Sequence, residues 1–478
     1  MEPLIGRIAE KNILKDVLAS GKPELVAIYG RRRIGKTFLI RKQYADHIIF
    51  EFSGIHSASL ANQLQNFTNS MQTAAGSPAA LAVPKSWLQA FHQLQGIIQP
   101  KLDQGRAVIF LDEFPWANSA RSGFLEAFEH FWNSWCTKQD NLVVVICGSA
   151  AAWMIRNIVN NKGGLHNRIS QKIRLLPFTL FETELYLKSN HVNVDQYQIL
   201  QIYMAIGGVP QYLKNIKPGQ SAAAAIDELC FTKDGLLRNE FDNLYRSLFD
   251  KADHHIDVIK SLAAKGSGLT RNEIIAACSL SSGGTTTRLI EELVESGFIA
   301  PYIPFGKDVK DSIYKLIDEY SHFYLKFMNS RVQSGNNTWL KMSAGPSWKS
   351  WSGFAFENIC IKHTSQIKSA LGIAAVNTQE SVWRYVPGKG EKGAQIDLLI
   401  DRQDNCINIC EMKFSTSEFI IDPGYAAELK NKLAVLKVKT KTRKTLFLTM
   451  ITTNGVKQNI NYVGLVQQNL QMDILFLK

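Results

Sequence analysis

The sequence predicts an α/β protein, with a parallel sheet in its N-terminal part and a second α/β region in its C-terminal part. Three observations predict this fold class. Over residues 1–180, short β-rich runs alternate with longer helical patterns, as a parallel sheet requires. Several of these runs are apolar throughout, which is typical of strands covered by helices on both faces. From Trp351 onward, a helical pattern again leads into apolar strands.

The length and composition of the chain predict its number of domains, its partners and its location. A chain of 478 residues is too long for one hydrophobic core and suggests about three domains. The formal net charge of +12 fits a nucleic-acid partner without establishing one. Because the chain has neither an apolar run long enough for a bilayer nor a signal-peptide pattern at its start, we expect no membrane partner and a cytoplasmic location. The seven cysteines are scattered without a Cys-x-x-Cys pair, so buried free thiols are expected rather than disulfides or zinc ligands.

Five runs are expected to form the strands of the N-terminal sheet. They are Leu25–Tyr29, Ile48–Phe52, Ala107–Leu111, Leu142–Cys147 and Ile173–Leu176. Residues 181–250, which follow this region, read as mainly helical, with a break at residues 207–210.

A glycine-rich loop follows the first expected strand and matches the pattern G-x-x-x-x-G-K-[ST] in full. The loop residues expected to hold the ligand are Gly30, Arg31, Arg32, Arg33, Ile34, Gly35, Lys36 and Thr37. The two glycines let the backbone turn tightly and aim its N–H groups at phosphate, and the start of the next helix adds partial positive charge. Lys36 is expected to reach the β- and γ-phosphates, and the Thr37 hydroxyl is expected to bind magnesium. ATP and Mg²⁺ are therefore the predicted cofactors.

Two acidic residues, Asp112 and Glu113, end the third expected strand. Burying carboxylates at the end of an apolar strand is costly unless they meet a cation or water. We expect Asp112 to hold magnesium, directly or through water, and Glu113 to polarise the attacking water. An isolated Asp-Glu pair would instead be read as a solvated turn, but the phosphate loop upstream favours the metal site.

Two further residues are candidates for the same site. Ser149 follows the fourth expected strand, where it is either a sensor of the γ-phosphate or part of a simple strand-end turn. Arg168 is either a finger-like positive charge for the transition state or a solvated arginine.

With these residues in view, residues 1–250 resemble the archaeal-type AAA ATPases, which also occur in bacteria. The elements that carry the resemblance are Ile5-Gly6-Arg7 with Glu10, residues 30–37, Leu111-Asp112-Glu113, Leu176-Pro177-Phe178 and residues 203–213. The resemblance implies a P-loop ATPase core followed by a helical lid, with the opening element near the adenine. The family tends to have Gly-Arg where this chain has Asn167-Arg168, which leaves the finger role open.

Residues 254–318 show the order helix, helix, helix and hairpin, which is the order of a winged helix-turn-helix. The expected elements lie near 254–263, 270–278, 284–296, 298–304 and 312–317. Arg288 near the start of the third helix, together with Lys307, Lys310 and Lys315 around the wing, offers contacts to DNA phosphates or bases. A structural or protein-binding role of this segment is an equal alternative.

Three charged residues lie on adjacent expected strands in the C-terminal region: Asp397, Glu411 and Lys413. Glu411 and Lys413 are two residues apart on one strand, so they are expected to point to the same face. An Asp, a Glu and a Lys in this arrangement can bind a divalent metal and orient a water, although an exposed salt bridge is the alternative.

This pattern resembles the PD-(D/E)XK nuclease fold, with Ile396 in place of the motif's proline. The resemblance implies Asp397 and Glu411 as metal ligands, Lys413 as the residue that positions water or phosphate, and Glu357 as an additional acid. The basic run over residues 430–444 is either a solvated helix face or a track for a phosphate backbone.

Taken together, the sequence predicts a P-loop NTPase parallel sheet with a helical lid, a winged helix-turn-helix and a C-terminal α/β restriction-endonuclease-like domain. The predicted parts are 1–180, 181–250, 251–320, a connector over 321–350, and 351–478. Three functions stay open: an ATP-driven enzyme that processes double-stranded DNA, with or without endonuclease activity; a nucleotide switch whose C-terminal domain binds DNA or protein without cleaving; and an ATP site that serves assembly alone. The core also looks able to act with a neighbouring copy in a homo-oligomer.

Overall fold

The computed structural model describes residues 3–76, 80–160, 163–249, 252–329, 337–388 and 392–478. Contacts divide the chain into two compact units. The N-terminal unit comprises Met1–Pro177, Arg246–Asp250 and Glu291–Gly297, and the C-terminal unit comprises the remainder. The division into five parts stays a prediction, because the helical region and everything that follows it pack largely as one unit. No helix in the described ranges is both long enough and apolar enough to cross a membrane.

The N-terminal unit contains a five-stranded sheet in the order β2-β3-β4-β1-β5, and all of its paired strands are parallel. Its strands are β1 (Glu24–Tyr29), β2 (Ile48–Ser53), β3 (Ala107–Asp112), β4 (Leu142–Gly148) and β5 (Gln171–Arg174). The predicted parallel sheet is confirmed. Only β5 lies two residues earlier than predicted, because this edge strand is largely exposed and Leu175 and Leu176 follow it.

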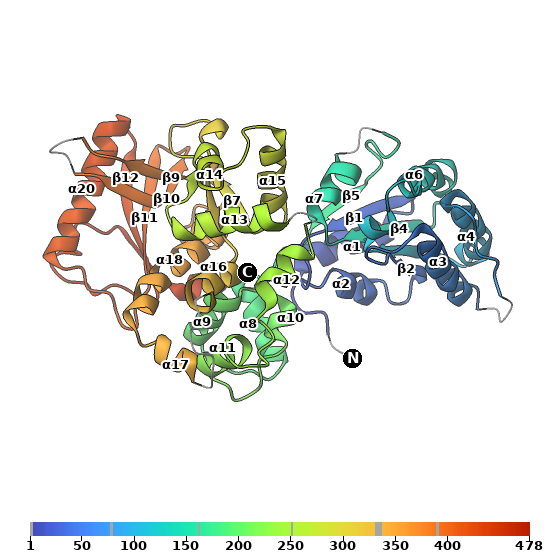
Figure 1. Ribbon diagram of the computed structural model, residues 1–478. Helices are drawn as coiled ribbons and strands as arrows, with labels where there is room; N and C mark the ends of the chain where they lie inside the picture. Colours follow the sequence, from blue (N-terminus) through green and yellow to red (C-terminus); the bar gives the residue numbers. More distant parts are fainter. Residues whose placement is uncertain (1–2, 77–79, 161–162, 250–251, 330–336, 389–391) are drawn as a thin grey trace. The chain divides into compact units, whose positions relative to one another are not determined.

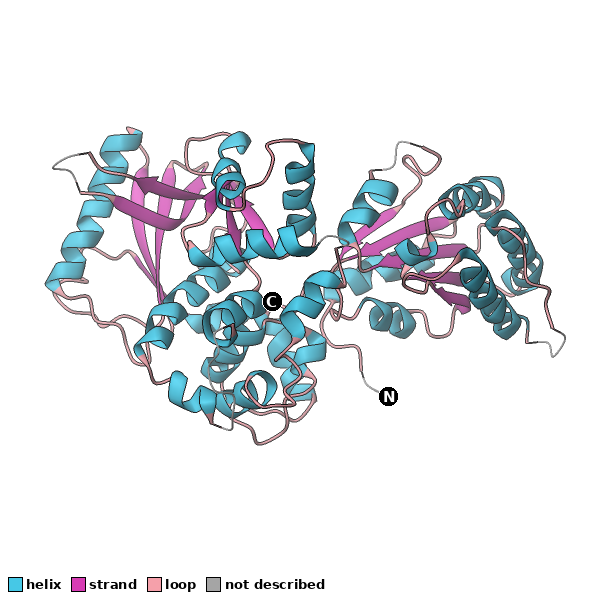
Figure 2. Cartoon of the chain, in the orientation of Figure 1, coloured by secondary structure: helices cyan, strands magenta, loops and turns pink. Residues whose placement is uncertain are grey.

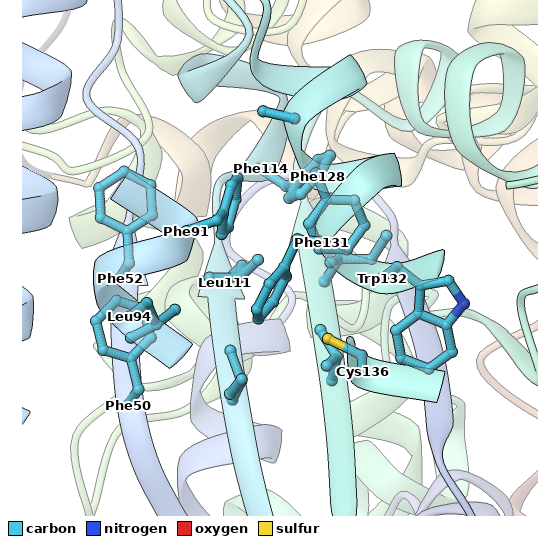
Figure 3. Packing of buried hydrophobic residues seen from close by; sticks show 14 of the residues in the cluster. Phe50, Phe52, Phe91, Leu94, Leu111, Phe114, Phe128, Phe131, Trp132 and Cys136 are labelled. Carbon is cyan, nitrogen blue, oxygen red and sulfur yellow. The ribbon is translucent and has the colours of Figure 1, made fainter. Parts of the chain in front are cut away.

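Both faces of this sheet are covered by helices, which explains the apolar strands (Figure 1). Val108 and Phe110 of β3 pack on the side of α1 (Ile8–Ala19) and α2 (Lys36–Gln43). Alternate residues of the same strand, such as Leu111, pack on the opposite side. The helices on that side include α3 (Leu60–Ala75), α4 (Trp87–Leu102) and α6 (Phe124–Ser134). Figure 3 shows the aromatic core between them, in which Phe91 stacks on Phe131 at 4.8 Å between ring centroids.

Helices make up the first part of the C-terminal unit. They are α8 (Leu180–Ser189), α9 (Gln196–Ile206), α10 (Pro210–Leu213), α11 (Ala222–Cys230) and α12 (Glu240–Arg246). The Gly-Gly-Val-Pro break between α9 and α10 packs against Phe178. The Phe178 N–H donates to the Gly208 carbonyl at 2.7 Å, and the Tyr203 hydroxyl donates to the Phe178 carbonyl at 2.9 Å. The two sequence elements that resemble the ATPase family are thus joined by hydrogen bonds.

The stretch predicted as a connector contributes to the core of the C-terminal unit. It contains α16 (Glu319–Phe323), the π-helix η4 (Tyr324–Met328) and α17 (Thr338–Met342). Trp339, which is 1% exposed, stacks on Phe231 of α11 at 5.7 Å and meets the edge of Trp348 at 5.1 Å. Through these aromatic contacts, the described residues of this stretch join the helical region to the C-terminal part.

Residues 252–316, here called the helix–hairpin segment, follow the predicted order. The elements are α13 (Ala252–Ala264), β6 (Leu269–Thr270), α14 (Arg271–Ala277), α15 (Gly284–Glu295), β7 (Ile299–Tyr302) and β8 (Ile313–Leu316). The strands form a sheet in the order β6-β8-β7. The short strand β6 was not predicted, because two residues leave no periodic pattern in the sequence.

A second five-stranded sheet has the order β13-β12-β11-β10-β9. Figure 2 shows its strands in magenta and the helices around them in cyan. Its elements are β9 (Thr378–Tyr385), β10 (Ala394–Arg402), β11 (Cys406–Lys413), β12 (Thr445–Thr452) and β13 (Gln468–Gln471), with helices α18 (Pro346–Lys362), α19 (Thr364–Ala370) and α20 (Pro423–Thr440). Strands β9, β10 and β11 pair antiparallel, whereas β11, β12 and β13 pair parallel. The three central strands lie where the sequence predicts them. The edge strands β9 and β13 were missed because their exposed residues break the apolar pattern.

All seven cysteines are free, and five of them are buried, in agreement with the prediction of free thiols.

A buried histidine makes the stability of the C-terminal unit depend on pH. The His363 Nε2 atom accepts a hydrogen bond from the Leu180 N–H at 3.1 Å, and Nδ1 lies 2.8 Å from the Ile359 carbonyl. The ring must therefore be neutral, with its proton on Nδ1. Burial lowers the pKa of His363 from 6.5 to about 4. Since the unfolded chain binds the proton more tightly, this contribution to stability is complete above pH 6.5 and is lost as the pH falls toward 4.

We therefore expect the unfolding free energy to fall by at most about 3 kcal/mol between pH 6.5 and 4 because of this residue. In His363→Gln, that part of the pH dependence should disappear, as measured by denaturant unfolding at a series of pH values. The exposed His254→Gln in the same unit is the control. An unchanged pH dependence in His363→Gln would contradict the assignment.

Candidate functional site

The glycine-rich loop joins the end of β1 to the start of α2, and its two glycines serve different purposes. A Cβ atom on Gly30 would lie 2.2 Å from the Leu175 carbonyl oxygen, so no side chain fits there. Gly35 has φ 88° at the N-cap of α2, a left-handed conformation that other residues rarely adopt. One glycine permits a close approach of two backbones and the other permits the turn into the helix.

Lys36 is folded back onto this loop. Its side chain is 6% exposed, and Nζ donates to the carbonyls of Gly30 at 2.7 Å and Arg31 at 2.8 Å. Burial lowers the pKa of Lys36, because the charged form loses water. The loop's own carbonyls thus hold the ammonium group where phosphate oxygens would replace them.

Thr37 and Asp112 are in direct contact. The Thr37 hydroxyl donates to Asp112 Oδ2 at 2.7 Å, and Asp112 Oδ1 accepts from the Glu113 N–H at 3.0 Å. A hydroxyl and a carboxylate oxygen are ligands that Mg²⁺ prefers, with the remaining positions filled by phosphate and water. The described residues contain no group of three or more His, Cys, Asp or Glu side chains able to hold a metal. These residues therefore fit a magnesium ion that a bound nucleotide completes.

Glu113 and Ser149 contact each other directly. Glu113 Oε2 accepts from the Ser149 hydroxyl at 2.7 Å and from its N–H at 3.1 Å. Glu113 has φ 42°, a left-handed conformation that places it between β3 and α5 (Phe114–Ala117). Because β4 lies between β1 and β3, the residues after all three strands reach one edge of the sheet. Ser149 is thus placed to hold the Glu113 carboxylate, a contact that the sequence alone did not reveal.

Three arginines lie near this edge of the sheet, and they differ in their contacts with the glycine-rich loop. The Arg7 Nη2 atom donates to the Ile34 carbonyl at 3.2 Å, so the opening element lies against the loop. The Arg32 guanidinium lies 4.7 Å from the centre of the Trp116 ring. Arg168 is exposed in the turn before β5, and among the described residues its side chain contacts neither the loop nor Glu113.

The second candidate site lies on β10 and β11. Leu398 pairs with Cys410 at one end of this antiparallel ladder, and Asp397 and Glu411 are the next residues of the two strands beyond that pair. The Tyr425 hydroxyl of α20 donates to Glu411 Oε2 at 3.1 Å, and Lys413 Nζ lies 5.0 Å from the centre of the same ring. Glu411 and Lys413 therefore share the face toward α20, as their spacing predicts.

Each acid of this second site is paired with a lysine that sequence reasoning did not place there. Lys432 of α20 donates to Glu411 Oε1 at 2.8 Å, and Lys315 of β8 lies 3.6 Å from Asp397 Oδ1. Asp397 also accepts a hydrogen bond from Gln395 at 2.9 Å. Lys315 was expected at the DNA-facing wing but is only 6% exposed. The basic run 430–444 was the one sequence signal that could have pointed to Lys432.

Glu357 lies on α18 near these groups. Burial raises the pKa of Glu357 to about 8, and the Asp397 carboxylate adds to the rise, while Lys413 and Lys315 oppose it. The described residues show no metal-holding group here either, and ammonium groups stand beside both Asp397 and Glu411. In this arrangement the residues do not fit a divalent ion, because lysines already pair with two of the carboxylates. Metal binding by Asp397, Glu411 and Glu357 stays a prediction.

Residues 4–216 match the model of a family described as an ATPase domain predominantly from Archaea. This match covers less than half of the chain, and it makes the N-terminal part similar to archaeal ATPase domains. The match covers the glycine-rich loop, Asp112, Glu113 and the Gly-Gly-Val-Pro element. The site at the edge of the first sheet therefore lies within the residues that match an ATPase family.

Comparison with known proteins also finds more distant similarity. An uncharacterized protein of Methanocaldococcus jannaschii is 22% identical over 360 residues, which cover 74% of this chain and 76% of that protein. Among solved structures, the Walker-type ATPase of Pyrococcus abyssi has 15% identity and a TM-score of 0.48, covering 67% of this chain and 96% of that chain. The ORC2 protein of Aeropyrum pernix has 14% identity and a TM-score of 0.42, covering 72% and 97%.

Proposed function

We propose that the ATPase domain uses ATP and Mg²⁺ to act on DNA, and that the C-terminal unit binds a DNA strand without cutting it. The observation that carries this proposal is the pairing of Asp397 with the buried Lys315 and of Glu411 with the partly buried Lys432. Lys315 and Lys432 neutralise Asp397 and Glu411, which leaves Lys413 as an additional positive charge. A site with this balance suits a phosphate group better than a divalent cation.

In the ATPase domain, Lys36 would exchange its two carbonyl partners for the β- and γ-phosphates. Thr37 and Asp112 would hold magnesium, which supplies positive charge to the phosphates when it is bound. Glu113 would orient the attacking water, and Ser149 would hold Glu113 until the γ-phosphate competes for the hydroxyl. Arg168 is exposed, so it is available to the site of a neighbouring copy in a homo-oligomer.

Contacts to DNA would be spread over the C-terminal unit. Helix α20 presents the exposed Lys430 and Lys437, and the exposed Lys441 follows the helix directly; such basic residues suit a phosphate backbone. Arg288 is exposed on α15 of the helix–hairpin segment, where a winged helix places its recognition residues. These positively charged groups also account for part of the formal net charge of +12.

A second candidate function is metal-dependent cleavage of DNA. It is favoured by the clustering of Glu357, Asp397, Glu411 and Lys413, whose charges influence one another. In that case Lys315 and Lys432 would have to leave the two carboxylates before a metal binds.

One experiment separates the two candidates. Purified protein is incubated with plasmid and linear DNA, with Mg²⁺ or Mn²⁺, with and without ATP. The variants are Lys36→Ala and Glu411→Ala, and the exposed Glu418→Ala is the matched control. We expect wild type to bind DNA without cutting it, and we expect Lys36→Ala to hydrolyse ATP at least about 100-fold more slowly than wild type.

Cleavage that is present in wild type and Glu418→Ala but lost in Glu411→Ala would replace the strand-binding proposal with the nuclease. The Lys36→Ala reactions would then show whether ATP controls cleavage. A wild-type protein that hydrolyses ATP but neither binds DNA nor responds to it would contradict both candidates.

A further inference from the structure

We propose that a cavity between the helix–hairpin segment and the C-terminal sheet binds one phosphorylated nucleotide of a single DNA strand. This inference rests on the proposed function and names the form of DNA that it concerns. The cavity has a volume of about 320 Å³, at the lower end of the range for small-ligand pockets. Lys307 and Lys315 line it from the helix–hairpin segment, and Trp383, Arg384 and Asp397 line it from β9 and β10.

The two walls of this cavity are held together by specific contacts. The Phe305 N–H, in the turn between β7 and β8, donates to the Val382 carbonyl of β9 at 2.8 Å. Pro304 forms a parallel β-bridge with the same residue. The Phe305 ring packs against the hydrophobic core of the C-terminal sheet. The hairpin turn is therefore docked on the sheet, and the cavity is a defined feature of the C-terminal unit.

The acidic residues that line the cavity already have partners. Glu273 accepts from Lys265 Nζ at 2.7 Å and from the Thr270 N–H at 2.8 Å. Asp397 lies beside Lys315, and Asp311 accepts from the N–H of Asp308 at 3.3 Å. Lysines thus balance the charges of Glu273 and Asp397, whereas Asp311 is held by a backbone N–H.

The basic residues Lys307 and Arg384, in contrast to these acids, have no partner for their side-chain charges among the described residues. Both are exposed, and among the described residues neither side chain has an ion pair or a hydrogen bond. Lys307 belongs to the turn of the hairpin and Arg384 to β9, so the two charges come from the two walls. A phosphate group between them would supply the missing counter-ion, as arginine and lysine do at nucleic-acid backbones.

The cavity is large enough for a nucleotide of single-stranded DNA but too small for double-stranded DNA. A volume of about 320 Å³ suits one nucleotide and excludes a base pair with its two backbones. Trp383 also lines the cavity, but it is only 8% exposed and belongs to the hydrophobic core of the C-terminal sheet, so it gives the cavity a rigid wall. A nucleotide held here would lie beside Asp397, which connects the cavity to the second candidate site.

The test measures DNA binding by the full chain, separately from cleavage and ATP hydrolysis. Fluorescence anisotropy is recorded with a fluorescein-labelled single-stranded 12-mer DNA, the same sequence as RNA, and the corresponding DNA duplex, all in excess EDTA without ATP. The variant is Lys307→Ala with Arg384→Ala. The control is Lys233→Ala with Lys349→Ala, which removes two exposed cations of the same unit outside the cavity.

We expect the double variant to raise the Kd for single-stranded DNA about tenfold or more. The plot of log K against log salt should become shallower by about 0.7, the value for one phosphate of a single strand that is no longer neutralised. The control should keep the wild-type Kd and slope. An equal loss with RNA would support a strand-phosphate site that does not distinguish the sugar.

An unchanged Kd in the double variant, or a loss no greater than in the control, would overturn the cavity while leaving the proposed function in place. A loss confined to the duplex would also overturn it. If wild type bound no DNA, the proposed function itself would fail, and this inference would fail with it.

Discussion

Glu113→Gln is expected to lower the rate of ATP hydrolysis by about 10²–10⁴-fold and to leave ATP binding intact. Glutamine has the shape of glutamate, and its carbonyl oxygen can still accept the bonds from the Ser149 hydroxyl and N–H. The loop, Lys36 and Thr37 are unchanged, so the phosphates keep their partners. What is lost is the negative charge that would draw a proton from the attacking water. Phosphate release and the fluorescence of a bound ATP analogue measure the two effects separately.

Two further variants test whether the loss of hydrolysis comes from the Glu113 carboxylate itself. The exposed Glu126→Gln removes a carboxylate of the same unit away from the site and should leave both measurements unchanged. Ser149→Ala frees Glu113 from its hydroxyl partner but keeps the backbone N–H, so its effect on hydrolysis should be smaller than that of Glu113→Gln. If Glu113→Gln hydrolysed ATP at the wild-type rate, Glu113 would not be the residue that activates water.

Gly208→Ala is expected to destabilise the C-terminal unit by about 4 kcal/mol or more, or to prevent its folding. A Cβ atom at this position would lie 2.0 Å from the carbonyl oxygen of Phe178 and within 3 Å of two other backbone atoms of that residue. Backbone atoms cannot rotate away as a flexible side chain can. The Phe178 N–H would also lose its bond of 2.7 Å to the Gly208 carbonyl. Chemical denaturation followed by tryptophan fluorescence measures the change.

The matched control for this prediction is Gly353→Ala. Gly353 lies inside α18, and a Cβ atom there would meet nothing within 4 Å. Because alanine is the better helix former, this change should be neutral or stabilise the protein by up to about 1 kcal/mol. Equal stability of Gly208→Ala and wild type would show that the Phe178 backbone can move aside, and the tight packing would then not hold the two elements together.

The parts of the fold that the sequence predicted are those with a strong local pattern. The strands β1, β3 and β4 are buried on both faces, so their apolar runs mark them almost to the residue. The edge strands β9 and β13 escaped prediction, because half-exposed strands carry no unbroken apolar run. The stretch over residues 321–350 is predicted as a connector from its composition, which does not reveal that Trp339 and Trp348 contact each other in a buried aromatic cluster.

The two candidate sites also differ in how far the local sequence pattern reveals them. The phosphate-binding loop is contiguous, and its glycines and lysine act within a few residues of one another, so the pattern alone identifies it. The second site combines residues of β8, β10, β11, α18 and α20. Its acids were found from their strands, but the lysines that neutralise them were not.

The sequence by itself determined the ATPase domain, because a motif of eight consecutive residues encodes its own backbone turns and an apolar strand delivers Asp112 to its edge. Only the tertiary structure decided the state of the second site. Lys315 and Lys432 approach Asp397 and Glu411 because the hairpin turn docks on β9 and α20 packs on the sheet. Such contacts depend on how distant segments pack. No motif in the sequence marks these contacts, yet they determine whether a pair of carboxylates attracts a metal ion or a phosphate.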